Sequence, residues 1–395
     1  MDKATLKGLR VLDFTWMLAG PYATRILADF GAEVIKVQCA KTAGGAESNL
    51  TGYFNTWNRN KRGITLDMSH PEAREIALRL TGISDVVIEN FSPRVMSNWG
   101  LDYEKLKEIK GDLIMVSMSA MGQTGPWRDF VAYGPTIQAF SGITYLTSFS
   151  EDTPMGLGYA YSDVIAGLYA ALAVLAALEY RDRKGKGQYI DISEYEAMCT
   201  LMGPAILDAY LNNNEILPKG NEADHIPAAP YGCYRCLGMD RWCVIAVFNK
   251  AEWQALCHVM GHPSWSTDEK FSTLSKRKAH ANELDELLGQ WTAGYTSEEL
   301  VRLLQQAGVP AGVVQNAEDI AKDPQLRARG YFMKLEHPAL GMVTSDASPI
   351  KFSDSVTADW KTAPLLGEDN HYVYTELLGL TENELSLYIQ KGVIG

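Results

Sequence analysis

Asp163 stands in a setting that could support chemistry. It directly precedes fifteen uncharged residues, Val164–Leu178, whose composition is typical of a buried helix. An aspartate near a helix N-terminus is ordinarily a cap, worth about 0.3–1 kcal/mol. The same place suits a nucleophile, because the helix end keeps the carboxylate ionised and its N–H groups could face an oxyanion. The local pattern alone favours the cap, although Ala166, Gly167 and Ala170 would let another segment or a ligand approach closely.

The loop 58–67 ("NRNKRGITLD") is the second candidate, because Arg59, Lys61 and Arg62 gather in it. A solvated loop before a strand is the simpler interpretation. The formal net charge of -12 makes nucleic acid or an anionic membrane an unfavourable main partner, so an anionic ligand would need a local basic patch. Residues 89–91 end a predicted strand, and ligands of open α/β sheets bind at such ends.

The six cysteines do not predict a disulfide scaffold in a chain of 395 residues. Cys233 and Cys236 have the spacing of half a zinc site, with Cys243 and His225 nearby, but no second pair follows at a workable distance. Two strands joined by a turn at 238–240 explain the segment more simply. We therefore expect reduced thiols and no metal.

Composition indicates an ordinary soluble globular protein, with 46% apolar and 21% charged residues. The first residues show no charged segment followed by a long apolar run, which would mark a signal peptide. The apolar stretch Val164–Leu178 is shorter than the ~20 residues that cross a bilayer. These features predict a cytoplasmic protein.

The elements that must position these residues follow an alternating pattern. Strand Leu9–Phe14, a helix and strand Glu33–Gln38 form a βαβ unit, which implies a parallel sheet. A helix from Pro71 precedes strand Asp85–Phe91, and a helix capped by Asp102 precedes another strand. Three such units predict an α/β fold with a large, doubly wound, Rossmann-like domain.

The residue pattern of the chain changes near residue 212, which predicts further domains beyond a linker. We expect a large domain at 1–212, a polar linker at 213–225, a small α+β domain at 226–322 and a C-terminal segment at 323–395. The first turn reads "WMLAGP", so the glycine spacing of a dinucleotide site is missing. Walker, G-x-S-x-G and H-E-x-x-H motifs are also missing from the sequence, which disfavours NAD enzymes, kinases, serine hydrolases and zinc proteases.

The sequence resembles the family III CoA-transferases, which include formyl-CoA:oxalate and carnitine CoA-transferases and the 2-methylacyl-CoA racemases. The resemblance runs nearly end to end and is specific because ten short segments follow the family's order. These segments are "VLDFTWMLAGP", "GAEVIKVQ", "NRNKRGITLDM", "VVIENFSP", "GQTGP", "YSDVIAGLYAALAVLAALEYRDRKGKGQYIDIS", "AGVPAGVV", "DPQLRARGYF", "HPALG" and "APLLGED".

The resemblance implies that Asp163 is the catalytic aspartate and that coenzyme A binds as a substrate, with no permanent cofactor. It places the loop after the first strand against CoA, 66–69 near adenine and ribose, 90–92 beside pantetheine, and Tyr133 in the active site. It also implies an interlocked dimer, either a homodimer or a heteromer with a homologous subunit, whose C-terminal segment returns to the large domain. With the basic loop added, the candidate CoA-binding residues are Leu18, Ala19, Lys61, Arg62, Leu66, Asp67, Met68, Ser69, Asn90, Phe91, Ser92, Arg94 and Tyr133.

Two departures from the family pattern concern the phosphates of CoA. Cys39 and Asn98 stand where the formyl-CoA enzymes carry phosphate-binding arginines. Arg94, one helical turn before Asn98, and Lys41 are possible substitutes.

Two further departures concern the acyl group. Leu18 replaces a glutamine on the substrate side, and Gly134 replaces a glutamate beside the tyrosine. With Trp16 and Met17, these changes predict a larger and less polar acyl pocket than oxalate needs. They suggest a succinyl-type donor and an aromatic or branched dicarboxylic acceptor.

The resemblance implies that Asp163 attacks an acyl-CoA thioester, giving an aspartyl anhydride from which CoA is passed to a carboxylic acid. A racemase is the alternative within the family, but Tyr133 occupies the position of the racemase histidine. A tyrosine pKa near ~10 suits that two-base reaction poorly, which favours the transferase. A subunit of a hetero-oligomeric CoA-transferase is the third alternative, and the presence of Asp163 argues against a silent one.

Overall fold

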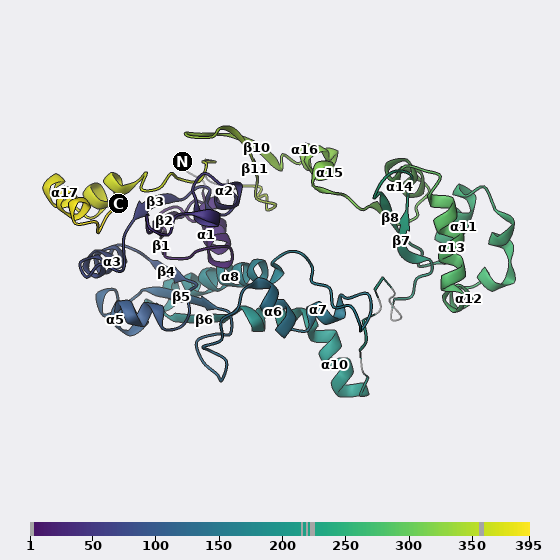
Figure 1. Cartoon of the computed structure of the whole chain (residues 1–395), viewed down its shortest axis with the longest axis horizontal. Coiled ribbons are helices and arrows are strands. Elements are labelled where there is room, and N and C mark those ends of the chain that lie inside the picture. Colours follow the sequence, from purple (N-terminus) through teal and green to yellow (C-terminus); the bar gives the residue numbers. More distant parts are fainter. Residues whose placement is uncertain (1–3, 215, 219, 222–225, 355–358) are drawn as a thin grey trace. The chain divides into compact units, whose positions relative to one another are not determined.

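The computed structural model describes most of the chain and divides it into two compact units, which are considered separately (Figure 1). The larger unit comprises residues 1–145, 156–216 and 327–395, and the smaller comprises 146–155 and 217–326. The described residues are 4–214, 216–218, 220–221, 226–354 and 359–395. His225 and residues 215, 219 and 222–224 of the predicted linker lie outside them.

A six-stranded parallel sheet forms the centre of the larger unit and confirms the predicted doubly wound α/β fold. The strand order is β3-β2-β1-β4-β5-β6, so the direction of winding reverses between β1 and β4. Ligands of such sheets bind where the order reverses, at the carboxyl ends of the strands. The strands are β1 (Arg10–Asp13), β2 (Glu33–Gln38), β3 (Arg62–Thr65), β4 (Val86–Glu89), β5 (Ile114–Ser119) and β6 (Tyr189–Ser193).

Both faces of this sheet are covered, because successive side chains of a strand point to opposite faces. Leu12 of β1 packs in one apolar layer with α3 and α5, whereas Val11 packs in the other with α1 and α8. The helices and short turns of this part are α1 (Ala19–Asp29), η1 (Gly45–Glu47), α2 (Gly52–Asn58), α3 (Ala73–Gly82), α4 (Val95–Trp99), α5 (Tyr103–Ile109), α6 (Gly134–Phe140), α7 (Ile143–Leu146), α8 (Tyr161–Lys184), α9 (Glu194–Cys199), η2 (Thr200–Met202) and α10 (Gly203–Asn212). Helix α3 begins two residues after the predicted Pro71, while Asp102 caps α5 as predicted.

Helix α8 packs against α1 through its small residues. A Cβ on Gly167 would lie 2.7 Å from the carbonyl oxygen of Ala19, so only glycine permits this approach. By length and composition alone, α8 could also cross a membrane. The core helix of a soluble protein has the same properties, and Ala166, Ala170 and Val174 are buried in this unit.

The C-terminal segment belongs to the larger unit from residue 327 onward, and α16 (Pro324–Ala328) spans the division between the units. The segment contains the antiparallel pair β10 (Phe332–His337) and β11 (Gly341–Asp346), a π-helical turn η5 (Tyr372–Leu377) and α17 (Glu382–Gln390). Tyr374 and Ile394 join the apolar layer that covers α3 and α5. The Tyr374 hydroxyl donates to the carbonyl of Thr65, 2.7 Å away, which fastens the segment to β3.

The smaller unit is built on a three-stranded antiparallel sheet. Strands β7 (Tyr231–Arg235) and β8 (Trp242–Ala246) form the predicted hairpin, and the six cysteines are free thiols. Residues 146–155 were assigned to the large domain but belong here, because the amide of Gly220 donates to the Ser148 carbonyl and Phe149 packs beside Gly220. The other elements are α11 (Lys250–Val259), η3 (Ser264–Thr267), η4 (Glu269–Phe271), α12 (Leu274–Ala279), α13 (Ala281–Thr292), α14 (Ser297–Gln306), β9 (Ala311–Val313) and α15 (Ala317–Lys322).

Candidate active site

Asp13, the last residue of β1, anchors the loop that follows this strand. Its carboxylate is fully buried and accepts hydrogen bonds from the Thr15 amide at 2.8 Å, Thr24 Oγ1 at 2.6 Å and Lys61 Nζ at 3.0 Å. Burial alone would raise the pKa of Asp13, but the charges of Lys61 and Lys36 outweigh it, so the pKa is lowered. The buried pair therefore holds the loop in place with Asp13 ionised.

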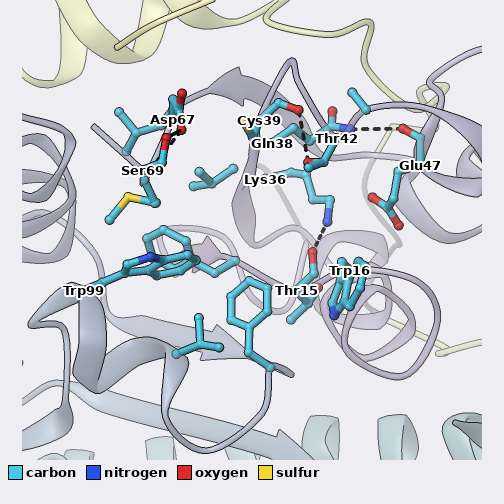
Figure 2. Close-up of a pocket in the computed structure, with 17 residues that line it drawn as sticks. Thr15, Trp16, Lys36, Gln38, Cys39, Thr42, Glu47, Asp67, Ser69 and Trp99 are labelled. Carbon is cyan, nitrogen blue, oxygen red and sulfur yellow. Dashed lines mark hydrogen bonds between the residues drawn. The ribbon is translucent and has the colours of Figure 1, made fainter. Parts of the chain in front are cut away.

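A cavity of about 380 Å³ opens beside this loop, at the carboxyl ends of β1, β2 and β3 (Figure 2). Figure 2 shows Lys36 reaching toward Thr15, to whose carbonyl oxygen its amino group donates. Asp67 accepts from Ser69 Oγ at 2.6 Å and from Lys41 at 2.6 Å, and these hydrogen bonds lower its pKa to about 2. The other lining residues are Phe14, Trp16, Val37, Gln38, Cys39, Thr42, Ala43, Glu47, Leu66, Met68, Phe91, Val95 and Trp99.

A smaller cavity of about 200 Å³ adjoins the first and holds Asp163. Trp16, Phe91 and Val95 line both cavities, so the two share a wall. The Asn90 side chain makes two hydrogen bonds with the Trp16 backbone. It accepts from the Trp16 amide at 2.8 Å and donates to the Trp16 carbonyl at 3.0 Å. The other lining residues are Met17, Ser92, Pro93, Ser119, Ala120, Arg128, Phe130, Val131, Ala132, Tyr133, Gly134, Asp163 and Glu194.

Asp163 is the third residue of α8. It therefore does not occupy the N-cap position, which the cap interpretation would require. The N-cap residue is Ala160, which has no capping side chain, whereas the Asp163 side chain lines the smaller cavity. Ser162 Oγ donates to Asp163 Oδ2 at 3.2 Å. A Cβ on Gly134 would lie 2.5 Å from the same oxygen, so Asp163 fits only because residue 134 has no side chain.

Asp163 faces a second acidic residue, Glu194, across the smaller cavity. Burial raises the pKa of Asp163 to about 6. Burial and the charge of Asp163 raise the pKa of Glu194 to about 8. Near neutral pH the pair therefore keeps one proton, which resides on Glu194, and Asp163 is the ionised nucleophile candidate.

The structure brings eight of the thirteen predicted CoA-binding residues into the two cavities. Leu66, Asp67, Met68 and Ser69 line the larger cavity, and Asn90, Phe91, Ser92 and Tyr133 line the smaller, with Phe91 in both. The remaining five are Leu18, Ala19, Lys61, Arg62 and Arg94. Cys39 also lines the larger cavity.

The residues that do not line either cavity have other partners. Leu18 and Ala19 are buried at the start of α1, where they pack in the core. Arg94 is exposed and lies 3.5 Å from Asp129. None of these three side chains faces the two cavities in the part of the chain that the structure describes.

The basic loop does not form the predicted phosphate grip. Lys61 is buried, and its amino group is held by Asp13, by the carbonyl of Pro21 at 3.1 Å and by Asn58 at 2.8 Å. Arg62 contacts Glu33 and Asp369 at 3.1 and 2.9 Å. The physical reason is the position of these two residues in the sheet. Lys61 precedes β3 and Arg62 is its first residue, whereas ligands bind beyond the carboxyl end of the strand.

Glu194 is the residue that the sequence interpretation missed. It directly follows β6, so it lies at the carboxyl end of a strand, as Asn90 and Leu66 do. The segment "QYIDIS" alternates apolar and polar residues and could have been assigned as a strand, which would have pointed to Glu194. Ser119, the last residue of β5, also lines the smaller cavity and was not among the predicted site residues, although its strand was predicted.

Comparison with known proteins agrees with this arrangement. The family model described as CoA-transferase family III matches residues 6–370. The chain is 35% identical to a succinyl-CoA–D-citramalate CoA-transferase of Chloroflexus aurantiacus, over 98% of each chain. It is 31% identical to a formyl-CoA:oxalate CoA-transferase of Afipia carboxidovorans, over 100% of this chain and 98% of that one.

A solved structure shows the same fold. The crystal structure of a CAIB/BAIF family protein from Brucella suis superposes with a TM-score of 0.87 at 33% identity, covering 95% of this chain and 100% of that one. Together with the match along most of the sequence, this likeness confirms the predicted resemblance. The chain belongs to CoA-transferase family III and is an enzyme of the CoA-transferase class.

Proposed function

We propose that this enzyme moves CoA from an acyl-CoA thioester to a carboxylic acid, with Asp163 as the nucleophile. One observation carries the proposal: an ionisable, half-buried carboxylate lines a small cavity that shares a wall with a larger one. The larger cavity suits the nucleotide end of CoA, and the smaller one suits the acyl group. A thioester that extends from one cavity into the other would come to Asp163.

The chemistry follows from the residue type. A carboxylate oxygen of Asp163 attacks the thioester carbon, the carbon–sulfur bond breaks, and CoA leaves as the thiolate. The product is a mixed anhydride, which is about as activated as a thioester, whereas an ester on a serine would be far less reactive. The acceptor carboxylate then attacks the aspartyl carbonyl carbon of this anhydride and displaces the donor acid as its carboxylate. The CoA thiolate attacks the acyl carbon of the new anhydride, which forms the product thioester and releases Asp163 as a carboxylate.

The CoA moiety would lie against the loops that follow the strands. We propose that Leu66–Ser69 contact adenine and ribose and that Asn90–Ser92 lie beside pantetheine. Lys36 lines the larger cavity and Lys41 lies at its edge, paired with Asp67 at 2.6 Å. With Cys39 and Asn98 in place of arginines, we propose that these lysines contact the phosphates of CoA.

The donor and acceptor follow from the smaller cavity. Phe91, Phe130 and Val131 give it apolar walls, and Arg128 adds one cation. This mixture suits an acyl group with an apolar body and a second carboxylate, such as a succinyl-type donor with a branched or aromatic dicarboxylic acceptor. The Chloroflexus relative is named for succinyl-CoA and the branched acid citramalate, which supports this choice.

Tyr133 bears on the alternative racemase activity. It lines the smaller cavity at the position of the racemase histidine, and its side chain is 59% exposed. A phenol in that place is a weak base at neutral pH, so we propose that Tyr133 lines the acyl pocket and that no α-proton is exchanged.

We further propose that two chains associate, as an interlocked homodimer or as a heteromer with a homologous subunit. Leu168, Leu172 and Leu175 lie on one side of α8 and are 46%, 62% and 44% exposed, although α8 is a core helix. A second chain would cover this apolar face. For the homodimer, sedimentation equilibrium of the purified protein should give twice the chain mass, and a monomer at micromolar concentration would refute the homodimer and leave the heteromer.

Trapping the intermediate tests the proposed function. The enzyme is incubated with succinyl-CoA and hydroxylamine, which should convert an aspartyl anhydride to a hydroxamate, and peptides are then mapped by mass. We expect the mass shift at Asp163, together with release of free CoA. A shift elsewhere, or CoA transfer without any trapped adduct over a panel of acyl-CoAs, would contradict the nucleophile. Rapid deuteration at the α-carbon of a 2-methylacyl-CoA in D₂O would instead support the racemase.

A further inference from the structure

Glu194 is an unusual residue in the smaller cavity, because it is buried without a partner. It is the first residue of α9, its exposed fraction is 7%, and its side chain lines the cavity that holds Asp163. Among the residues that the structure describes, its carboxyl group makes no hydrogen bond and no ion pair. Because this carboxyl group lines the cavity, a ligand bound there would supply the missing partner.

The elements packed around α9 place few charges near Glu194. Helix α8 contributes Asp163, the start of α6 contributes Tyr133, and β6 contributes Asp191, which accepts from the amide of Gln123 at 3.0 Å. The loop before α6 adds Arg128 to the cavity wall, and η2 carries no titratable side chain. The titratable residues of α9 itself, besides Glu194, are Tyr195, Glu196 and Cys199.

Two carboxyl groups in one small cavity cannot both ionise cheaply. The charge of Asp163 and burial raise the pKa of Glu194 to about 8, while burial raises that of Asp163 to about 6. Between these values Asp163 is an anion, and Glu194 is a neutral acid with one O–H to donate.

We propose that Glu194 is a second catalytic residue, whose O–H donates a hydrogen bond to the carbonyl oxygen of the thioester while Asp163 attacks the carbonyl carbon. This inference rests on the proposed function of Asp163. As the new carbon–oxygen bond forms, the carbonyl π electrons move to the oxygen, which Glu194 stabilises. As the carbon–sulfur bond breaks, those electrons return and the sulfur leaves with its bonding pair. The proton stays on Glu194 throughout.

The geometry of the cavity favours this role over a structural one. Gly134 brings no side chain to the cavity, so the carboxyl groups that line it are those of Asp163 and Glu194. If Glu194 were ionised, it would repel both the developing oxyanion and the incoming carboxylate. A neutral, fixed hydrogen-bond donor instead stabilises such charge.

Two variants of residue 194 distinguish a hydrogen-bond donor from a side chain that only fills space. Glu194→Gln keeps the size and an N–H donor, and Glu194→Leu keeps the size alone. We expect the Leu variant to lower kcat/KM for CoA transfer by about 100- to 1000-fold, and the Gln variant to stay within about tenfold of the native enzyme at pH 7. Circular dichroism and urea unfolding would establish that each variant is folded.

The pH profile gives the readout that a structural role would not move. In the native enzyme kcat/KM should fall below about pH 6, as Asp163 takes up a proton, and above about pH 8, as Glu194 loses one. The Gln variant cannot ionise, so it should lose the alkaline decline and keep the acidic one. An alkaline decline that persists in the Gln variant would overturn the inference.

Three more outcomes are decisive. A Leu variant within threefold of native activity would show that residue 194 is not needed for the reaction, and a Gln variant as poor as the Leu variant would show that hydrogen-bond donation is not what Glu194 supplies. Difference infrared spectra of the native enzyme against the Gln variant should show a protonated carboxyl band at pH 7, and its absence would also refute the inference. These results differ from a failure of the proposed function, which would appear as no CoA transfer and no trapped adduct in the native enzyme.

Discussion

Asp13 is a fully buried carboxylate and Asp163 a half-buried one in the same unit, and their surroundings are opposite. Asp13 is held by Lys61 at 3.0 Å and by two threonines, and the nearby lysines lower its pKa despite burial. Asp163 receives a hydrogen bond from Ser162 at 3.2 Å and has no ion pair among the described residues, so its partial burial raises its pKa to about 6. The partners of such an acid distinguish a supporting group from a reactive one.

The comparison also explains why the active site is built as it is. The Asp13–Lys61 pair fixes the loop after β1, whose residues Trp16 and Met17 line the smaller cavity. A charge that is already neutralised cannot react, but it can hold its neighbours in place. Asp163 is left without a cation, and its charge is available for an acyl group.

Asp163→Asn removes the proposed nucleophile and should have the largest effect on the rate of CoA transfer. Asparagine cannot form the anhydride, so the rate of CoA transfer should fall by about three or more orders of magnitude. The raised pKa means that the ionised side chain costs stability above about pH 6, so the free energy of unfolding at pH 7 should stay equal or rise. CoA exchange followed by mass and urea unfolding measure the two quantities, with the exposed Asp208→Asn as control. Retention of more than a tenth of the native rate would remove Asp163 from its role.

Lys61→Met should break the supporting side. Loss of the cation leaves Asp13 without its closest ion-pair partner in the core, which should lower the free energy of unfolding by about 3–5 kcal/mol. The double variant Asp13→Asn/Lys61→Met, measured by urea unfolding, should recover much of this loss. A stable Lys61→Met enzyme with a raised KM for acyl-CoA would instead restore the phosphate contact predicted from the basic loop.

Gly134→Ala should sharpen the comparison by displacing the reactive group alone. The added Cβ would lie 2.5 Å from Asp163 Oδ2, and a shift of about 1 Å in a nucleophile costs on the order of 100-fold in rate. Gly111→Ala is the matched control, because a Cβ there meets nothing within 4 Å. Equal kcat values for the two variants would show that Asp163 tolerates displacement.

Lys41→Ala should give the smallest effect. The Lys41 side chain is 74% exposed and pairs with Asp67 at the edge of the larger cavity, so screening limits what its charge can contribute. We expect KM for acyl-CoA to rise up to about fivefold at low salt and less at high salt. Lys107→Ala, in the exposed pair with Glu104, controls for general charge effects. No change in KM at low salt would exclude Lys41 as a substitute for the missing arginines.

Much of the fold could be predicted from the sequence, because it depends on local patterns. Apolar strand residues and the cap at Asp102 each act within a few positions, and they gave the parallel sheet. The loops at 66–69 and 90–92 came from the family resemblance, and the rule that ligands bind at strand carboxyl ends indicated only residues 89–91. The excursion of residues 146–155 into the smaller unit was missed, since it depends on a contact with Gly220.

The sequence by itself determined the family, the parallel sheet and the identity of Asp163 as the candidate nucleophile. Only the tertiary structure decided which charged side chains interact with one another. Whether Lys61 meets Asp13 or a phosphate, and whether Glu194 faces Asp163 or solvent, depends on contacts between residues 48 and 31 positions apart. Such contacts form when strands and helices pack together. The packing determines which partners and how much water surround each charge, and these determine its energy.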